Sequence, residues 1–430
     1  ISYLRGEHPA KFPVRLYPDI YNDDRIISSF PNRDLKNNLI TDDAKIKYLK
    51  LIGCEMKDYQ LEKYNQFDSN KSEDEYGAFN SDAMMASNIV FPYDDSRVKN
   101  LISKNGFNNL IRYSEKKGLS FKKDEYKNYF LRGEIGKYST KLANILKSLD
   151  KSKGIVFIYS KFIYGGVLPI ALMLEMNGYV KYDGSLISGK KNNPDDKKYI
   201  IISGDPNLSK NTYKRYLKIE ENNKNGELVK VIIGSETAAE GLDFKYLREV
   251  HILDPWHHFN KQDQIIGRAI RNCSHKNLPF EERNVLVFLY AAVKPINDME
   301  TIDLKMYRTA EKKMKQIAEI EYILKINSVD CNLNLNSNKF LDDIYKKKYS
   351  ILTSQGTRHQ ITLNDIENSK KCNFRECDFK CIPDLYKFNK NKVEKSTMTI
   401  ESIPDTIFDI KLMIKDLYKI NFIYKLEDIK

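Results

Sequence analysis

Long hydrophobic runs are missing from this sequence. No window holds the roughly 18 uninterrupted apolar residues that a membrane-spanning helix needs, and the first residues do not pair a charged start with an apolar stretch as a secretory leader does. We therefore expect neither a membrane-embedded nor a secreted protein, but a soluble, intracellular one.

Cysteine is also scarce, and its spacing does not suggest the disulfide framework of a small secreted domain. The thiols are therefore predicted to be reduced. The six cysteines of the 430 residues are Cys54, Cys273, Cys331, Cys372, Cys377 and Cys381.

Three of these cysteines lie close together in "CNFRECDFKC", as Cys372, Cys377 and Cys381. Thiolates at this spacing supply three of the four ligands of a zinc ion, and Cys331 or His359 would complete the set. The spacing differs from the common C-x2-C pattern, so a group of reduced thiols without a metal is the alternative.

Basic residues outnumber acidic ones. Lys and Arg number 71 and Asp and Glu 59, which gives a formal net charge of +12 and a pI near 9.0. This balance favours a polyanionic partner, with nucleic acid ahead of an acidic membrane surface.

A chain of 430 residues is too long for one ordinary core, so two or three domains are expected. Between residues 153 and 290, short and almost continuous apolar runs alternate with turns and helix-like stretches, which indicates a parallel α/β sheet. The predicted strands are residues 154–160, 198–203, 228–234, 248–253 and 283–290. A helix over 167–177 is predicted between the first two, because Pro169 suits its first turn and Gly178 its end.

The flanking regions are predicted to be mostly helical. Residues 1–133 would form a linker and insertion region, 134–295 the sheet domain, and 296–430 a basic C-terminal extension. Apolar residues recur every three or four positions along 304–324, the pattern of an amphipathic helix that packs on the sheet domain.

The stretch "QIIGRAIR", residues 264–271, is the most informative motif. On a helix, Gln264, Arg268 and Arg271 share one face, and Gly267 permits a close approach of a neighbouring backbone. Two guanidinium groups presented together suit a chain of phosphates. A pair of ordinary surface salt bridges is the alternative.

A second motif, "GSETAAEGLDF", covers residues 234–244. Thr237 would offer a hydroxyl, and the turn around Gly241 would offer backbone amides, to phosphate oxygens. Asp243 would accept hydrogen bonds from ribose hydroxyls.

In this order, separated by one strand, the two stretches resemble motifs V and VI of superfamily 2 helicases, and "GIVFIYSKF" resembles motif IV. The resemblance implies a RecA-like second helicase lobe, in which Arg271 is the arginine finger and Arg268 assists it. It assigns nucleotide contacts to Gln264, Gly267, Gly241 and Asp243, and nucleic-acid contacts to Ser160, Lys161, Ser235 and Thr237.

Longer stretches, among them "ISYLRGEHPAKFP" and "DPWHHFNKQDQIIGRAIR", resemble the helicase-like NTPases of nucleocytoplasmic large DNA viruses. Poxvirus kin are nucleoside triphosphate phosphohydrolase I and the small subunit of the early transcription factor. The family implies an ATPase that uses ATP with Mg, acts on duplex DNA in viral transcription, and resides in the host cytoplasm or the virion. An RNA helicase and a non-hydrolysing nucleic-acid-binding scaffold are the alternatives.

A phosphate-binding loop is not found. "GSLISGKK", residues 184–191, has the glycine spacing, but Lys191 stands where Ser or Thr must reach magnesium, and no strand leads into it. Since the chain also starts without Met, we expect a first RecA-like lobe upstream of Ile1, and we expect this part alone to be inactive.

Overall fold

The computed structural model describes residues 12–21, 26–27, 31–69, 81–114, 118–189, 193, 195–209, 211–239, 242–295, 299–332, 335, 343–382 and 404–420. The chain forms two compact units, one of residues 1–323 and 336–379 and one of 324–335 and 380–430. Among the described helices, none combines the length and the apolar character needed to cross a bilayer.

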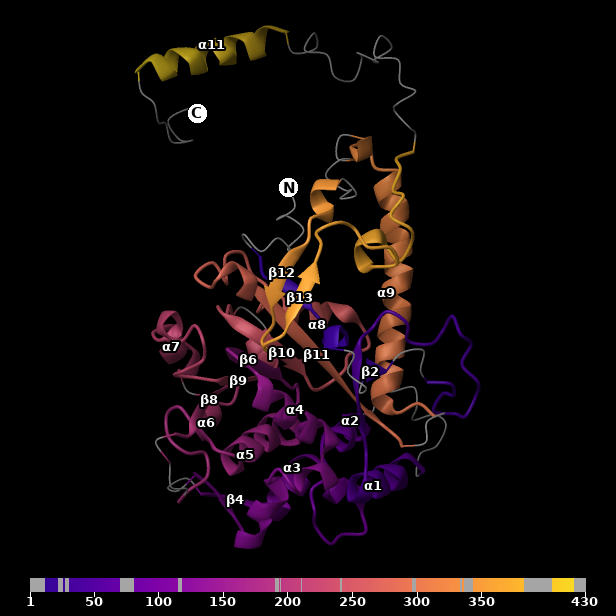
Figure 1. Cartoon of the computed structure of the whole chain (residues 1–430), viewed down its shortest axis with the longest axis vertical. Helices are drawn as coiled ribbons and strands as arrows, with labels where there is room; N and C mark the ends of the chain where they lie inside the picture. Colours follow the sequence, from indigo (N-terminus) through magenta and orange to yellow (C-terminus); the bar gives the residue numbers. More distant parts are fainter. Residues whose placement is uncertain are drawn as a thin grey trace. The chain divides into compact units, whose positions relative to one another are not determined.

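A nine-stranded sheet lies at the centre of the first unit (Figure 1). All neighbouring strands are parallel except β2 and β3, which are antiparallel. The five strands predicted between residues 154 and 290 are β6, β8, β9, β10 and β11, so the predicted parallel α/β sheet is confirmed. In spatial order the strands are β2 (Ile26–Ile27), β3 (Leu51–Glu55), β11 (Asn284–Val293), β10 (Leu247–Ile252), β6 (Ile155–Tyr159), β9 (Val231–Gly234), β8 (Lys197–Ile202) and β7 (Tyr179–Lys181), and β1 (Val14–Leu16) also pairs with β11.

Both faces of the sheet are buried, as the continuous apolar runs require. Successive side chains of a strand point to opposite faces, so Val156 and Ile158 of β6 join one hydrophobic cluster, and Phe157 and Tyr159 join the other. Helices α4 (Thr140–Lys151) and α5 (Leu168–Met176) cover the first face, and α8 (Phe259–Ile266) and the start of α9 (Ile302–Ile326) cover the second.

Local sequence signals set the helix ends on the first face. The Ser139 side chain caps α4 by accepting a hydrogen bond from the backbone N–H of Leu142. The helix predicted at 167–177 is α5, which has Pro169 in its first turn and follows the π-helical turn η7 (Ile163–Val167). Gly178, at φ +82°, then lets the chain leave the helix.

Helices account for most of the regular structure before α4, as predicted. These are α1 (Asp58–Ser69), α2 (Ser81–Asn88) and α3 (Ser103–Leu110). However, β3 from this region pairs with β11 inside the main sheet, and β4 (Ile111–Ser114) and β5 (Gly118–Phe121) form a small antiparallel pair. None of these strands was predicted.

The predicted amphipathic helix is α9, but its apolar stripe is buried mainly in the first part of the helix. Leu304, Tyr307 and Ala310 are buried against the sheet domain, whereas Ile317 and Ile320 are exposed. An antiparallel hairpin of β12 (Tyr349–Leu352) and β13 (Arg358–Ile361) follows in the first unit. The second unit contains α11 (Pro404–Ile420).

The prediction of reduced thiols holding zinc is wrong in this structure. Cys372 and Cys377 form one disulfide, and Cys331 and Cys381 form another. Zinc needs thiolate ligands, and a sulfur bonded to another sulfur cannot be one. The described residues contain no group of three or more His, Cys, Asp or Glu placed to hold a metal, and His359 lies within β13.

Candidate nucleotide and nucleic-acid site

The loops that carry the two motifs start at neighbouring points on one edge of the sheet. β9 ends at Gly234 and β10 at Ile252, and β6 lies between them in the sheet. The carboxyl ends of parallel strands share an edge, where α/β proteins usually bind their ligands. The segments after β6, β9 and β10 therefore converge there.

The local structure of "QIIGRAIR" differs from the predicted single helix. Gln264 lies in the last turn of α8, which ends at Ile266. Beyond Ile266 the turn is tighter than in an α-helix, because the N–H of Arg268 donates to the carbonyl of Ile265, three residues earlier, at 3.1 Å. A Cβ on Gly267 would lie 2.9 Å from the carbonyl oxygen of Asp263, so the close backbone approach at this glycine is to its own helix.

Even so, the predicted residues surround one pocket of about 630 Å³. Gln264, Gly267, Arg268 and Arg271 line it from the second motif, and Asp243 lines it from the first. The structure thus brings together residues from two loops that are separated by β10. Phe12, near the start of the chain, also lines the pocket and was not predicted.

The two arginines differ in their accessibility. Arg271 is 44% exposed and lies 2.9 Å from Asp243 Oδ1, whereas Arg268 is 13% exposed, lies 3.9 Å from the same oxygen and donates to the carbonyl of Leu242 at 3.1 Å. Asp243 is itself 69% exposed, and an ion pair with an exposed carboxylate contributes only ~0.2–1 kcal/mol. The salt bridges of the alternative interpretation do exist, yet they are weak enough to be exchanged for a ligand.

The predicted nucleic-acid contacts are not all accessible. Ser160 and Ser235 are both buried, and the Ser160 hydroxyl accepts a hydrogen bond from the N–H of Phe162 at 3.2 Å, so it shapes its own turn. Thr237 is exposed, and its Oγ1 lies where a Cβ on Gly204 would come within 2.9 Å. Gly241 lies outside the described residues.

Lys161 belongs to a basic and aromatic group that the sequence did not reveal. Its Nζ lies 5.0 Å from the ring centroid of Trp256, the only tryptophan, and Lys261 Nζ lies 5.9 Å from the same ring. Burial lowers the pKa of Lys161, although the Asp254 charge opposes this. Trp256 is half-buried, so it combines a packing role with a face turned to two cations.

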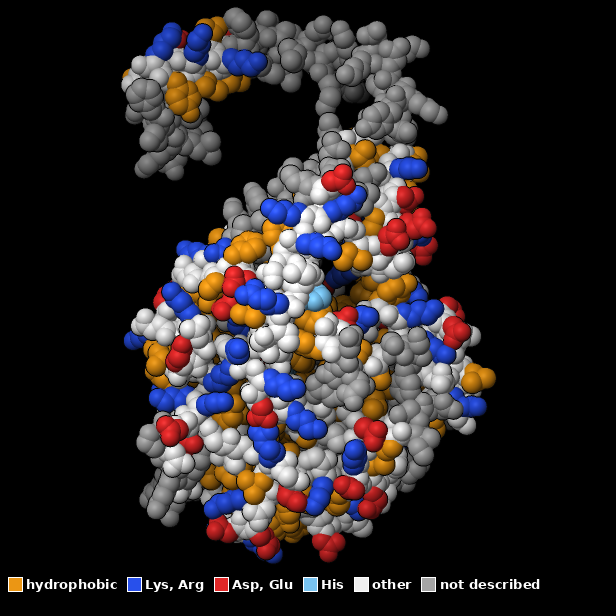
Figure 2. All heavy atoms as spheres, viewed as in Figure 1, with side chains coloured by type: hydrophobic (Ala, Val, Ile, Leu, Met, Phe, Trp, Pro, Cys, Tyr) orange, Lys and Arg blue, Asp and Glu red, His pale blue; other side chains and the backbone are white. Residues whose placement is uncertain are grey.

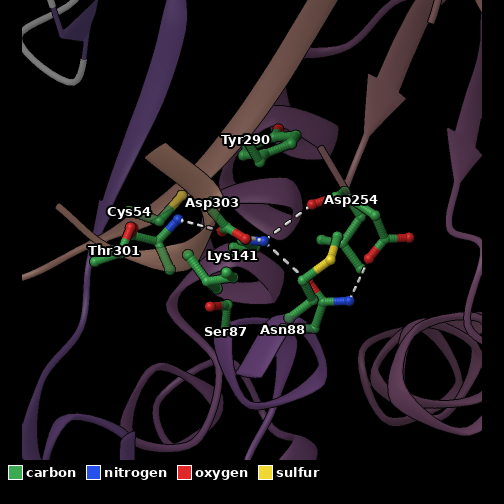
Figure 3. A network of polar contacts seen from close by, with 12 residues as sticks. Cys54, Ser87, Asn88, Lys141, Asp254, Tyr290, Thr301 and Asp303 are labelled. Atoms are coloured by element: carbon green, nitrogen blue, oxygen red, sulfur yellow. Dashed lines mark hydrogen bonds and ion pairs between the residues drawn. The ribbon is translucent and has the colours of Figure 1, made fainter. Parts of the chain in front are cut away.

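A buried polar network connects several helices to the segments at this edge of the sheet (Figure 3). The Lys141 Nζ forms an ion pair with Asp303 and donates to Asn88 Oδ1 at 2.9 Å. The Asn88 amide donates to Asp254, which also accepts from the N–H of Lys161 at 2.7 Å. The network therefore ties α2, α4 and α9 to the segments after β6 and β10.

Comparison with known proteins agrees with the motifs. Residues 139–273 match the family model described as "Helicase conserved C-terminal domain". A protein of Acanthamoeba polyphaga mimivirus, provisionally named an ATP-dependent RNA helicase, is 33% identical over 345 residues, which cover 79% of this chain and 51% of that protein.

Two further relatives come from other large DNA viruses. A provisionally named helicase of Invertebrate iridescent virus 3 is 28% identical and matches 87% of this chain and 35% of its own length. A termination factor NPH-I homologue of African swine fever virus is 30% identical over 46% of this chain and 33% of that protein. The chain spans about a third to a half of the length of these curated relatives. Residues 139–273 are therefore similar to helicase C-terminal domains, and the chain is similar to part of helicase-like proteins of large DNA viruses.

Proposed function

We propose that this chain is the second lobe of a nucleic-acid-dependent ATPase that acts on duplex DNA in viral transcription. The observation that carries the proposal is the single pocket shared by Gln264, Arg268, Arg271 and Asp243. Two guanidinium groups at the rim of an open pocket suit the triphosphate of ATP with its Mg.

In this proposal the phosphates of ATP are held by a first RecA-like lobe outside this sequence. Closure of the two lobes would bring Arg271, the more exposed arginine, to the γ-phosphate, where it stabilises the charge that develops in the transition state. Arg268 is held by the carbonyl of Leu242 and would position the loop. Alternating closure and opening would move the protein along nucleic acid.

The nucleic acid would contact Lys161 and Trp256, which are partly exposed, and the exposed Thr237, whereas Lys261 is buried and paired with Glu236. An ammonium group and an exposed hydroxyl suit a phosphate backbone. A second candidate, an RNA helicase, is favoured by the provisional name of the mimivirus relative. The host cytoplasm or the virion is the proposed location, together with the viral transcription machinery.

The decisive experiment replaces Arg271 by Ala in the full-length viral protein. ATP turnover should fall by a factor of about 10³ or more, by comparison with other arginine fingers, while nucleotide binding persists. Arg132→Ala removes another exposed arginine paired with a carboxylate, Asp150, and should leave turnover unchanged. Wild-type turnover in Arg271→Ala would refute the assignment.

The nucleic acid is identified by the same ATPase assay. Turnover of the wild-type protein is measured with duplex DNA, single-stranded DNA or RNA at one salt concentration, because phosphate contacts are salt-dependent. The proposal requires that duplex DNA stimulates most. Greater stimulation by RNA would favour the RNA helicase, and no hydrolysis under any condition would favour a scaffold.

A further inference from the structure

A second pocket, of about 670 Å³, lies at the edge of the sheet opposite the arginine pocket. Its walls come from the segments that lead into β6, β9 and β11 and from the first residues of β8 and β10. Leu352 and Thr353, from the end of β12, complete it. The amino ends of parallel strands are not where this fold usually binds ligands, so the pocket is separate from the site described above.

The lining of this amino-edge pocket is strongly basic. Its only two carboxylates are Glu227 and Glu282. Glu282 lies 3.3 Å from an Arg248 nitrogen, and Glu227 accepts a hydrogen bond from the side chain of Asn225. Its six cationic side chains are Lys153, Lys197, Lys198, Lys224, Lys230 and Arg248.

Among the described residues, no ion pair involves four of these lysines, Lys153, Lys197, Lys198 and Lys224. Figure 2 shows Lys and Arg side chains gathered over the area in which Figure 1 draws β6, β8 and β9. The Nζ atoms of Lys197, Lys198 and Lys224 lie 5.9, 5.7 and 5.9 Å from tyrosine rings, contacts that do not neutralise their charge. Cations around a concave surface produce a local positive potential and attract anions.

Two further cations lie deep in the pocket. Lys230 is 8% exposed, and its Nζ donates to the carbonyls of Ser152 at 2.8 Å and Gly154 at 2.5 Å. Arg248 is 4% exposed and donates to the carbonyl of Leu352 at 2.7 Å. Neutral carbonyls hold Lys230 in place without cancelling its charge.

Burial is the main cause that lowers the pKa of Lys230 to about 8. The charges of Lys197 and Arg248 also lower this pKa, whereas those of Glu249 and Glu227 raise it. An anion bound beside Lys230 would restore the charged ammonium.

Two glycines make the shape of the pocket possible. Gly154 and Gly226 both have positive φ, +83° and +82°. A Cβ on Gly154 would lie 2.6 Å from Arg248 Cγ, and one on Gly226 would lie 3.2 Å from the Gly154 carbonyl. The segments around Gly154 and Gly226 can therefore approach each other closely enough to form the floor of the pocket.

We propose that the amino-edge pocket binds a compact small molecule that carries several phosphate groups. The volume lies within the range of small-molecule sites, and cations occupy both its floor and its rim, so phosphates at different depths find partners. A nucleic-acid duplex would contact the rim lysines but could not bring its phosphates down to Lys230 and Arg248.

The test uses inositol hexakisphosphate as the probe and isothermal titration calorimetry of the full-length protein, in a buffer of about 150 mM ionic strength that screens weak surface contacts. One saturable site is expected. The triple variant Lys153→Gln/Lys198→Gln/Lys224→Gln should weaken binding by at least about tenfold, and its circular dichroism melting curve should match wild type because rim lysines are not in the core.

The matched control Lys122→Gln/Lys312→Gln/Lys313→Gln removes three exposed lysines elsewhere and should change the affinity by less than about twofold. Equal weakening by both triple variants, or the absence of a saturable site, would overturn the proposal. So would a rim variant that loses affinity for duplex DNA but keeps its affinity for the probe, because the surface would then serve nucleic acid. Arg271→Ala should retain probe binding while it loses ATP turnover, which separates this proposal from the ATPase proposal.

Discussion

The Nζ of Lys141 lies 2.6 Å from Oδ2 of Asp303, and neither side chain is exposed. Burial raises the pKa of Asp303, while the Lys141 charge and the N–H of Ala292 oppose this. The pair joins α4 to the start of α9, and through Asn88 it reaches the segment that carries Lys161. The position of the predicted nucleic-acid contact thus depends on an ion pair that no ligand can reach.

Lys141→Met should therefore destabilise the protein strongly. It leaves the Asp303 carboxylate without its counter-ion and the side-chain Oδ1 of Asn88 without the Lys141 donor. Breaking a buried pair in this way costs about 3–5 kcal/mol in the free energy of unfolding. Urea unfolding measures the change. Lys137→Met, which breaks the exposed pair with Glu134, should cost less than about 1 kcal/mol, and equal effects of the two variants would contradict the assignment.

His275 should make stability depend on pH. It is buried, its Nε2 lies 2.7 Å from the carbonyl oxygen of Leu247, and burial lowers its pKa from 6.5 to about 3. Below pH 6.5 the histidine is protonated in the unfolded chain but stays neutral in the folded protein. The contribution of neutral His275 to the free energy of unfolding is therefore complete above pH 6.5 and is lost as the pH falls toward 3. At pH 5 the loss is about 2 kcal/mol, from about 1.36 kcal/mol per pH unit.

Unfolding of His275→Gln at pH 7 and pH 5 isolates this contribution. Glutamine keeps a donor for the Leu247 carbonyl but does not titrate, so the difference between the two pH values should shrink by about 2 kcal/mol. His359→Gln changes a less buried histidine in β13 and should behave like wild type. An unchanged pH dependence in His275→Gln would show that His275 is not the titrating group.

The sheet could be predicted from the sequence because its strands are buried on both faces. Runs such as residues 154–160 and 283–290 are apolar at almost every position, a pattern typical of parallel strands between helices. The grouping of Asp243 with Arg271 was also foreseen, since parallel strands deliver their loops to one edge. The sequence was therefore sufficient to predict the sheet and the edge at which the two motifs lie.

Other features depended on contacts between distant segments. β3 has an ordinary short sequence, and only its pairing with β11 reveals it. The amino-edge pocket gathers lysines from three separate segments, none of which forms a motif. The exposure of Ile317 and Ile320 in α9 could not be predicted, because they continue the same periodicity as the buried Leu304.

The disulfides give a direct chemical prediction. The denatured protein, without reductant, should show two reactive thiols, Cys54 and Cys273, instead of six. A zinc site built on Cys331, Cys372, Cys377 and Cys381 would give six thiols and release zinc on denaturation. Thiol titration with a chromogenic disulfide reagent decides between them, and a Cys54→Ser/Cys273→Ser variant should give none.

Asp243→Asn should lower the KM of the full-length protein for ATP. Asp243 lies 2.9 Å from Arg271, and in the proposed mechanism it competes with the γ-phosphate for that guanidinium. An exposed pair of this kind is worth ~0.2–1 kcal/mol, so its removal should lower KM for ATP by up to about fivefold. Asp124→Asn, which changes an exposed carboxylate paired with Lys127, should leave KM as it is. A higher KM for ATP, together with an unchanged KM for 2′-deoxy-ATP, would instead indicate that Asp243 binds the ribose. Only ATP has the 2′-hydroxyl that would donate a hydrogen bond to this carboxylate.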